Sequence, residues 1–404
     1  MGQSAFAQDR NIRHFWWGNP ERDKRTLEVI RLFNEKNPGI VVSGETLGMA
    51  DYFTRLTTQI AGRNMADTIQ MGYGVMFEYI DRGAILPLDD YIGGVLDISK
   101  MDESAISAGR VDGKLYALSI GANSHVAMYN TRLFEEAGVE FDPFGWTYDE
   151  LQSIAAKVKE TTGVFGSDDC TADYQVFSDY VHQRDERLYD EEGNFGVPPQ
   201  LIVDYFNMFA GMRAAGSVTD GRASAGLIGT EISNWGIVTG KTAITYAFSN
   251  QLVGVQNLTQ DKLGAAMFPN TPAMIPGSII QPSQFICLSR DTVDAEAAVS
   301  YMSAFVNDPE LTAVLGLERG IPANSEVRAA LQPTLNEIEA TSVAFFDGIQ
   351  GKTMDLLPPP PSGAQEIEAM FKRVAVAVLL DQASIEDVAS QIVREAEGIR
   401  RRSR

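Results

Sequence analysis

Cysteine and histidine are scarce in this chain of 404 residues, which contains two cysteines and three histidines. Cys170 and Cys287 alone provide no disulfide framework. His14, His125 and His182 are far apart, and none has a second histidine or cysteine at metal-binding spacing. The sequence therefore predicts no zinc site.

Long apolar runs and nucleotide-binding loops are also missing. No stretch of about 18 consecutive apolar residues occurs, so the sequence predicts no membrane span. No Gly-x-Ser-x-Gly elbow, phosphate loop or dinucleotide glycine fingerprint stands where a strand meets a helix. These absences argue against serine hydrolases and nucleotide-dependent enzymes, and we expect no cofactor.

Positive charge is low: 33 basic side chains stand against 54 acidic ones, and the formal net charge is -21. Such a charge repels phosphate backbones and anionic lipid surfaces, so neither nucleic acid nor a membrane surface is an expected partner. The basic end, Arg400 to Arg404, is short and is expected to be solvated at a helix C-terminus.

The patterns that are present predict an α/β protein. A chain of this length is too long for one ordinary core and favours two lobes. Asn19 can cap a helix that begins at Pro20, and strands are predicted at 40–42 and 68–71 on either side of a helix at 51–61. Further helices are predicted at 200–215, at 294–307, near 364–380 and near 384–398, and one follows the capping box of Thr147 and Glu150. Four consecutive prolines, 358–361, predict an extended segment.

Two of the four tryptophans, Trp16 and Trp17, are adjacent at the end of the first predicted strand. Neighbouring strand residues point to opposite faces, so we expect one to be structural and the other to face a ligand site. Trp146 and Trp235 are interpreted as packing residues, and Asp67 as a structural cap.

Adjacent carboxylates leave two interpretations open. Asp168-Asp169 could hydrogen-bond the hydroxyl groups of a neutral ligand after a predicted strand. A glycosidase needs two carboxylates, and adjacent pairs such as this one and Asp89-Asp90 supply the residue type, although adjacent acids usually lie in solvated loops.

A series of segments, each weak by itself, follows the order seen in one family. The segments are Tyr52–Gly62, Ala66–Gln70, Val111–Leu118, Met128–Val139, Trp146–Leu151, Gly240–Ile244, Asn307–Glu310 and Arg319–Pro322. In this order they resemble the extracellular solute-binding proteins of family 1, the sugar-capturing subunits of ABC importers. The resemblance covers nearly the whole chain from about residue 11; it departs at Met65-Ala66-Asp67, where the family has a proline before the aspartate.

The resemblance implies the type II fold of periplasmic binding proteins, with two lobes, each a mostly parallel sheet flanked by helices, joined by a hinge. Residues 11–123 with 284–335 would form the N-terminal lobe, and 124–283 with 336–404 the C-terminal lobe. Residues 1–10 resemble a residual signal segment, because Ala5 and Ala7 give the small-x-small pattern of a cleavage site; an ordinary disordered terminus is the alternative.

The resemblance also implies a ligand cleft between the lobes that closes about the hinge. The residues it places there are His14, Trp16, Trp17, Asn19, Gly72, Tyr73, Asn123, Asp168, Asp169, Tyr174, Phe248, Ser249, Asn250, Ser278, Gln281, Ser362 and Gly363.

The expected function is a periplasmic, monomeric binding protein that captures a mono- or oligosaccharide, performs no covalent chemistry and delivers the ligand to an ABC permease in the inner membrane. Aromatic rings can cover the apolar faces of a pyranose while amide, carboxylate and hydroxyl groups satisfy its hydroxyls. Arg13, His14 and Arg319 leave an acidic sugar open. Two alternatives are a charged non-sugar ligand, such as an opine or polyamine, and a carbohydrate-active enzyme with paired carboxylates.

Overall fold

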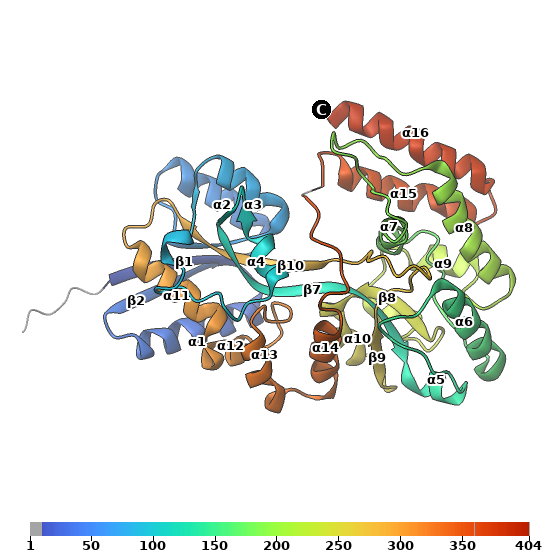
Figure 1. Cartoon of the computed structure of the whole chain (residues 1–404), viewed down its shortest axis with the longest axis horizontal. Coiled ribbons are helices and arrows are strands. Elements are labelled where there is room, and N and C mark those ends of the chain that lie inside the picture. Colours follow the sequence, from blue (N-terminus) through green and yellow to red (C-terminus); the bar gives the residue numbers. More distant parts are fainter. Residues whose placement is uncertain (1–9, 359, 404) are drawn as a thin grey trace, which may run out of the picture. The chain divides into compact units, whose positions relative to one another are not determined.

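The computed structural model describes residues 10–358 and 360–403, so nearly all of the predicted signal segment lies outside the described residues. The described chain divides into two compact units. Unit 1 comprises residues up to 123 and residues 281–336, and unit 2 comprises 124–280 and 337–403. The chain passes between the units within the long strand β7 (Ala117–Asn130), at the start of β10 (Ile280–Ser289), and after residue 336 (Figure 1).

Unit 1 is built on parallel strands that alternate with helices. Strand β1 (Arg10–Trp17) pairs in parallel with β2 (Ile40–Leu47) and with β3 (Thr68–Met71), and β10 pairs antiparallel with β3. The other elements of unit 1 are α1 (Pro20–Lys36), α2 (Met49–Ala61), α3 (Tyr73–Asp81), β4 (Ile85–Leu86), η1 (Asp89–Tyr91), α4 (Glu103–Ala108), β5 (Arg110–Val111), β6 (Lys114–Leu115), α11 (Ala295–Asn307), α12 (Pro309–Leu315), α13 (Ser325–Leu331) and η4 (Gln332–Thr334).

Helix α1 shows how local sequence sets these boundaries. The Asn19 side chain accepts a hydrogen bond from the backbone N–H of Arg22, and Pro20 occupies the first helical position, where a missing N–H costs nothing. Val29, Ile30 and Phe33 form its buried face. The predicted start of this helix is confirmed.

Unit 2 contains the remaining elements. Strand β7 pairs antiparallel with β8 (Ile244–Phe248) and with β9 (Leu263–Ala266), while isolated parallel bridges join Phe165 to Thr242 and Ser167 to Val218. Its helices are α5 (Thr131–Glu136), α6 (Tyr148–Thr162), α7 (Tyr174–His182), α8 (Pro199–Ala214), α9 (Gly221–Leu227), η2 (Ile232–Asn234), η3 (Ser249–Gln251), α10 (Leu252–Gln256), α14 (Glu337–Gly348), α15 (Ala364–Leu379) and α16 (Ile385–Ser403). The α/β prediction is confirmed.

Aromatic packing holds the helices of unit 2 together. The ring of Phe177 on α7 stacks on Phe371 of α15 at 4.6 Å and meets Tyr205 of α8 at 5.2 Å. All three belong to one continuous apolar core, and α15 and α16 run side by side at its edge (Figure 1). The predicted capping box at Thr147 and Glu150 is present at the start of α6.

The basic C-terminal end differs from its prediction at one position. Arg400 is 6% exposed and donates a hydrogen bond to the backbone carbonyl of Ser362, so it is not solvated as expected. Position 400 lies on the inner face of α16, in line with buried Ile392 and Ala396, and the guanidinium therefore anchors the segment that follows the prolines.

Across residues 10–358 and 360–403, no helix is both long and apolar enough to cross a bilayer.

The two adjacent tryptophans are expected to differ in their contribution to stability. Trp16 has no exposed surface, stacks on His14 and donates from Nε1 to Asp23, whereas Trp17 is 8% exposed and contacts Tyr52 and Phe53. Trp16→Ala should lower the free energy of unfolding by about 3–5 kcal/mol, and Trp17→Ala by less. Urea denaturation of both variants checks this, and a Trp17→Ala loss equal to or larger than that of Trp16→Ala would contradict it.

Candidate functional site

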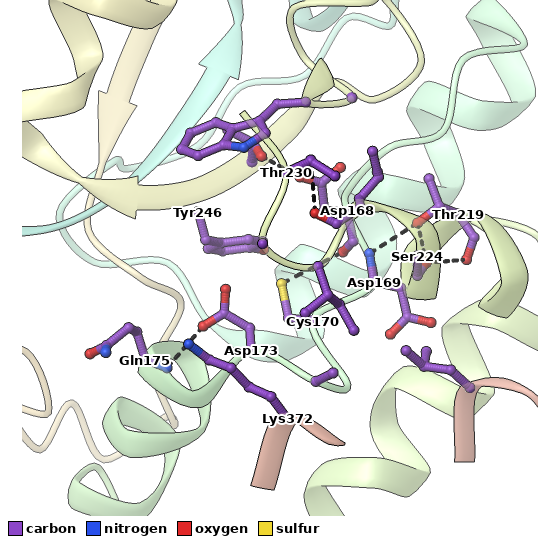
Figure 2. Close-up of a pocket in the computed structure, with 18 residues that line it drawn as sticks. Asp168, Asp169, Cys170, Asp173, Gln175, Thr219, Ser224, Thr230, Tyr246 and Lys372 are labelled. Atoms are coloured by element: carbon purple, nitrogen blue, oxygen red, sulfur yellow. Dashed lines mark hydrogen bonds between the residues drawn. The ribbon is translucent and has the colours of Figure 1, made fainter. Parts of the chain in front are cut away.

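A cavity of about 350 Å³ lies within unit 2. Its wall comes from segments far apart in the sequence: the loop before α7, the first turn of α7, α9 and the chain after it, β8, and α15 (Figure 2). The polar and aromatic side chains among its lining residues are Asp168, Asp169, Asp173, Gln175, Thr219, Ser224, Thr230, Trp235, Thr245, Tyr246 and Lys372. We name this cavity the unit 2 pocket.

The loop from Asp168 to Asp173 forms one side of the unit 2 pocket. It begins where the short extended segment beside β8 ends, because the Asp168 N–H donates to the carbonyl of Ile244 at 3.0 Å. The loop ends where the Asp173 carboxylate caps α7, accepting from the N–H groups of Gln175 and Val176 at 2.9 and 3.0 Å. A strand end followed by a helix start is a common position for ligand-binding groups in α/β proteins.

Asp169 is the fixed point of this loop. Its side chain has no exposed surface and forms an ion pair with Arg213 of α8, while Oδ1 accepts from the N–H of Thr171 at 2.9 Å. The Asp169 N–H donates to the hydroxyl of Thr219 at 3.3 Å. The charge of Asp169 is therefore matched by a partner inside the protein.

Asp168 and Asp173 lie in a different environment. Burial raises the pKa of Asp168 to about 6, although the hydrogen bond from Thr245 acts in the opposite direction. Burial also raises the pKa of Asp173, against the effect of the two cap hydrogen bonds and the charge of Lys372. Both carboxylates are thus held where their ionised form is poorly solvated.

Two aromatic residues line the pocket together with these acids. Tyr246 on β8 is 8% exposed and its hydroxyl lies 3.3 Å from that of Ser167. Trp235 follows η2 and is half-buried. The backbone after it approaches Asp168 closely, since a Cβ at Gly236 would lie 2.8 Å from Asp168 Oδ1, so glycine permits this contact.

A buried polar cluster joins β7, α7 and the segment before β10 within unit 2. His125 Nδ1 lies 2.8 Å from Asp179 Oδ1, and Ser278 donates its hydroxyl to the other oxygen of Asp179. The His125 ring also stacks on Phe268 at 5.2 Å. Burial by itself would lower the pKa of His125, but the charge and hydrogen bond of Asp179 outweigh it and raise that pKa.

The described residues hold no group of three histidine, cysteine, aspartate or glutamate side chains that could bind a metal ion. The pocket instead combines aromatic surface, hydroxyls, an amide and carboxylates, which is the chemistry of a site for a small organic solute.

Comparison with protein families also indicates a protein that binds small solutes. The model for bacterial extracellular solute-binding proteins matches residues 28–340. The chain belongs to this family. Its members are binding proteins of the ABC-transporter type rather than enzymes, they are exported, and they take small-molecule ligands to ABC permeases. The family resemblance seen in the sequence is confirmed.

Individual relatives of this solute-binding protein are similar over different extents. A binding protein of Brucella abortus is 34% identical over 136 residues, which make up 34% of this chain and 32% of the relative. The arabinooligosaccharide-binding protein of Halalkalibacterium halodurans is 29% identical over 120 residues, or 30% of this chain and 26% of that one. These matches span about a third or less of the curated relatives' length.

A solved structure matches the whole chain. An extracellular solute-binding protein of family 1 from Alicyclobacillus acidocaldarius superimposes with a TM-score of 0.89 at 26% identity, covering 97% of this chain and 98% of that one. The fold of the two proteins is therefore the same.

Only two of the site residues predicted in unit 2, Asp168 and Asp169, line the unit 2 pocket. Three others have polar atoms that are already bound inside the unit, and their contact with a ligand stays a prediction. Tyr174 is 6% exposed and its hydroxyl lies 3.2 Å from that of Tyr189, Ser249 accepts from the N–H of Ser124, and Ser278 donates to Asp179.

The remaining unit 2 predictions lie elsewhere. Phe248 is half-buried against His125, Asn250 is exposed in η3, Ser362 is exposed, and Gly363 precedes α15 with a φ of 88°. Their contact with a ligand stays a prediction.

In unit 1, His14 lies in the core and not at a ligand site, and Trp16 is the buried, structural member that was expected of the tryptophan pair. His14 is 1% exposed among Trp16, Tyr301 and Phe305, and Trp16 is fully buried, because both side chains point to the core face of β1. The prediction that Asp67 has a structural role is confirmed, because its carboxylate accepts hydrogen bonds from the backbone N–H of Arg13 and from the hydroxyl of Thr292.

The other predicted residues of unit 1 occupy turns and strand ends, and their contact with a ligand stays a prediction. Asn19 and Gly72 are helix caps, Tyr73 is half-buried at the start of α3, Trp17 is 8% exposed, and Asn123 and Gln281 are the unit 1 residues next to the first two chain crossings.

Sequence reasoning missed Asp173, Gln175, Trp235, Tyr246 and Lys372. Trp235, which was interpreted as a packing residue, is half-buried and lines the unit 2 pocket, whereas Trp146 is 2% exposed and donates to the carbonyl of Met267. The available signal was the polar neighbourhood of Trp235, because Ser233 and Asn234 favour an exposed turn, which keeps the adjacent ring near the surface.

The Asp169–Arg213 ion pair can be tested by removing its cation. Arg213→Leu leaves the buried carboxylate of Asp169 without its partner and should lower the free energy of unfolding by about 3–5 kcal/mol. Arg222→Leu, at an exposed position of α9, is the matched control and should change little. Adding Asp169→Asn to Arg213→Leu should restore part of the loss; a double variant less stable than Arg213→Leu would contradict the assignment.

The two buried histidines of unit 2 should affect stability with opposite pH dependence. A raised pKa in the folded state means that His125 stabilises the fold fully below its unfolded value of about 6.5 and loses this contribution as pH rises through the folded value. Burial lowers the pKa of His182, so its neutral form is favoured on folding and stability is lost as pH falls below about 6.5.

Urea denaturation of the wild type, His125→Gln and His182→Gln from pH 5 to 9 measures this. The stability difference between wild type and His125→Gln should shrink as pH rises, and that between wild type and His182→Gln should grow from pH 5 to 7. Parallel curves for wild type and His125→Gln would show that the contact with Asp179 carries no charge.

Proposed function

We propose that this solute-binding protein captures a saccharide at the unit 2 pocket and delivers it to an ABC permease. The observation that carries the proposal is the pairing of Trp235 and Tyr246 with the carboxylate of Asp173 and the amide of Gln175 around one cavity. The volume of about 350 Å³ falls in the range of small-molecule sites.

This combination suits a sugar for physical reasons. An indole or phenol ring can cover the apolar face of a pyranose, and the edge of that sugar carries hydroxyls that need partners. Leaving one buried hydroxyl without a hydrogen bond costs about 1–3 kcal/mol. Asp173 Oδ1 is used in the helix cap, and its second oxygen is directed toward Tyr246, where it can accept from a ligand (Figure 2).

The relatives support the same ligand class. The Halalkalibacterium halodurans protein, similar over 30% of this chain, binds arabinooligosaccharides, and the family as a whole supplies ABC permeases with solutes. The expected closure of two lobes on the ligand and the monomeric state remain predictions of the family resemblance.

A glycosidase is the weaker candidate. Such an enzyme requires two available carboxylates near the scissile bond, and in the Asp168-Asp169 pair the second acid is already bound to Arg213. A purified sample that releases product from a glycoside would favour the enzyme.

A thermal-shift screen over neutral, acidic, amino and acylated sugars, followed by calorimetry, tests the proposal. A saccharide at a hundred times its dissociation constant should stabilise the fold by about 2.7 kcal/mol. Trp235→Ala should weaken binding of that saccharide by about tenfold or more with little change in stability, because its half-buried ring offers a stacking surface.

Asn234→Ala, at the exposed neighbouring position, is the matched control and should bind as the wild type does. Unchanged affinity in Trp235→Ala would exclude the unit 2 pocket as the site, and a screen in which no saccharide raises the melting temperature would refute the ligand class.

A further inference from the structure

The charges around the unit 2 pocket are unequal. Three aspartates line it, and one of them, Asp169, is matched by Arg213. The Asp168 carboxylate accepts a hydrogen bond from the neutral hydroxyl of Thr245. Its other oxygen, Oδ1, is buried and makes no hydrogen bond within the described residues. The backbone N–H of Asp168 donates to the carbonyl of Ile244. Asp173 is bound by backbone N–H groups of α7.

Lys372 is the cation among the lining residues, and it is already engaged. Its ammonium group lies 2.6 Å from the carboxylate of Glu368, one turn earlier on α15. When Glu368 is included, three carboxylates that have no arginine partner in the described part of the chain, those of Asp168, Asp173 and Glu368, lie around the single positive charge of Lys372. The pocket therefore has a surplus of negative charge. Among the described residues that line the pocket there is no arginine, so none of them offers a guanidinium group to hold a ligand carboxylate by two hydrogen bonds.

The negative charge lies close to the aromatic side chain of Tyr246. In Figure 2 the Asp173 carboxylate is directed toward Tyr246, and Gln175 and Lys372 lie beside it. A ligand ring placed against the aromatic surface would therefore have a carboxylate at its edge.

We propose that the preferred solute is an amine-bearing saccharide, whose ring lies on the aromatic wall and whose ammonium group binds Asp173. This inference rests on the proposed function and specifies its ligand. An ammonium group offers three N–H donors and a positive charge, and it matches both the open oxygen of Asp173 and the nearby charge of Asp168.

The burial of the two acids explains why an amine would be selected. Each carboxylate loses solvation by water in the cavity. A ligand ammonium group stabilises the negative charge both by its own charge and by hydrogen bonds, whereas a ligand hydroxyl provides a hydrogen bond alone. Acylation of the amine removes its charge, and a uronic acid would add a like charge beside Asp173. The pocket should therefore rank amino sugars first, neutral sugars second and acidic sugars last.

Calorimetry at pH 7 with a matched series tests this order. The probes are glucosamine, N-acetylglucosamine, glucose and glucuronic acid, together with the corresponding disaccharides, and spermidine as a cation without a sugar ring. The amine should bind about tenfold or more tightly than its N-acetylated counterpart. Glucuronic acid should bind most weakly.

Asp173→Asn separates the charge from the fold, because asparagine is also a good helix cap and keeps the shape of the side chain. This variant should bind the amino sugar no better than the neutral sugar, with neutral-sugar affinity kept within about threefold of wild type. Asp90→Asn, at an exposed position of η1 in unit 1, removes the same charge far along the chain and should retain the wild-type preference.

The outcomes distinguish this inference from the proposed function. Equal binding of the amine and its N-acetylated counterpart, or tightest binding of the uronic acid, overturns the inference and leaves saccharide capture standing. If spermidine binds and none of the sugars does, saccharide capture is refuted. If the Asp173→Asn variant keeps the preference for the amine, the proposed role of Asp173 is refuted.

Discussion

The buried ion pair between Asp169 and Arg213 is the interaction on which the rest of the site depends. It holds the loop between the segment beside β8 and the start of α7, and the hydroxyl of Tyr205 reinforces it through the carbonyl of Cys170. A loop with few partners would fluctuate, since its backbone groups could turn to water. Because Asp169 is fixed, its two neighbours in the pocket, Asp168 and Asp173, keep their positions and their poorly solvated carboxylates.

This constraint separates the charges of the site into two kinds. Asp169 is neutralised by Arg213, whereas Asp168 and Asp173 have only neutral hydrogen-bond donors and line the cavity together with Tyr246. A binding protein benefits from such an arrangement, because the energetic cost of the empty site is recovered when a complementary ligand enters. The scaffold for this arrangement is the aromatic core that packs α7 against α8 and α15.

Much of the fold could be predicted from the sequence because its signals are local. The cap at Asn19, the capping box at Thr147 and the strand at 68–71 each depend on a few consecutive residues, and all are present. The site was harder to predict, because its wall combines residues from four separate segments and no local pattern shows which of them meet. Asp168 was found through its position after a strand, but Trp235 and Lys372 were not, and His14 was misplaced because its neighbours on β1 gave no sign of burial by Tyr301 and Phe305.

We propose that the solute binds in unit 2 at the wall formed by Trp235 and Asp173. A crystal structure of the protein grown with the tightest-binding saccharide tests it most directly. We expect electron density for a sugar ring against the Trp235 side chain, with a ligand donor within hydrogen-bonding distance of the Asp173 carboxylate. Density for the saccharide at a place that contacts neither residue, with the unit 2 pocket filled only by water, would show that the solute binds elsewhere.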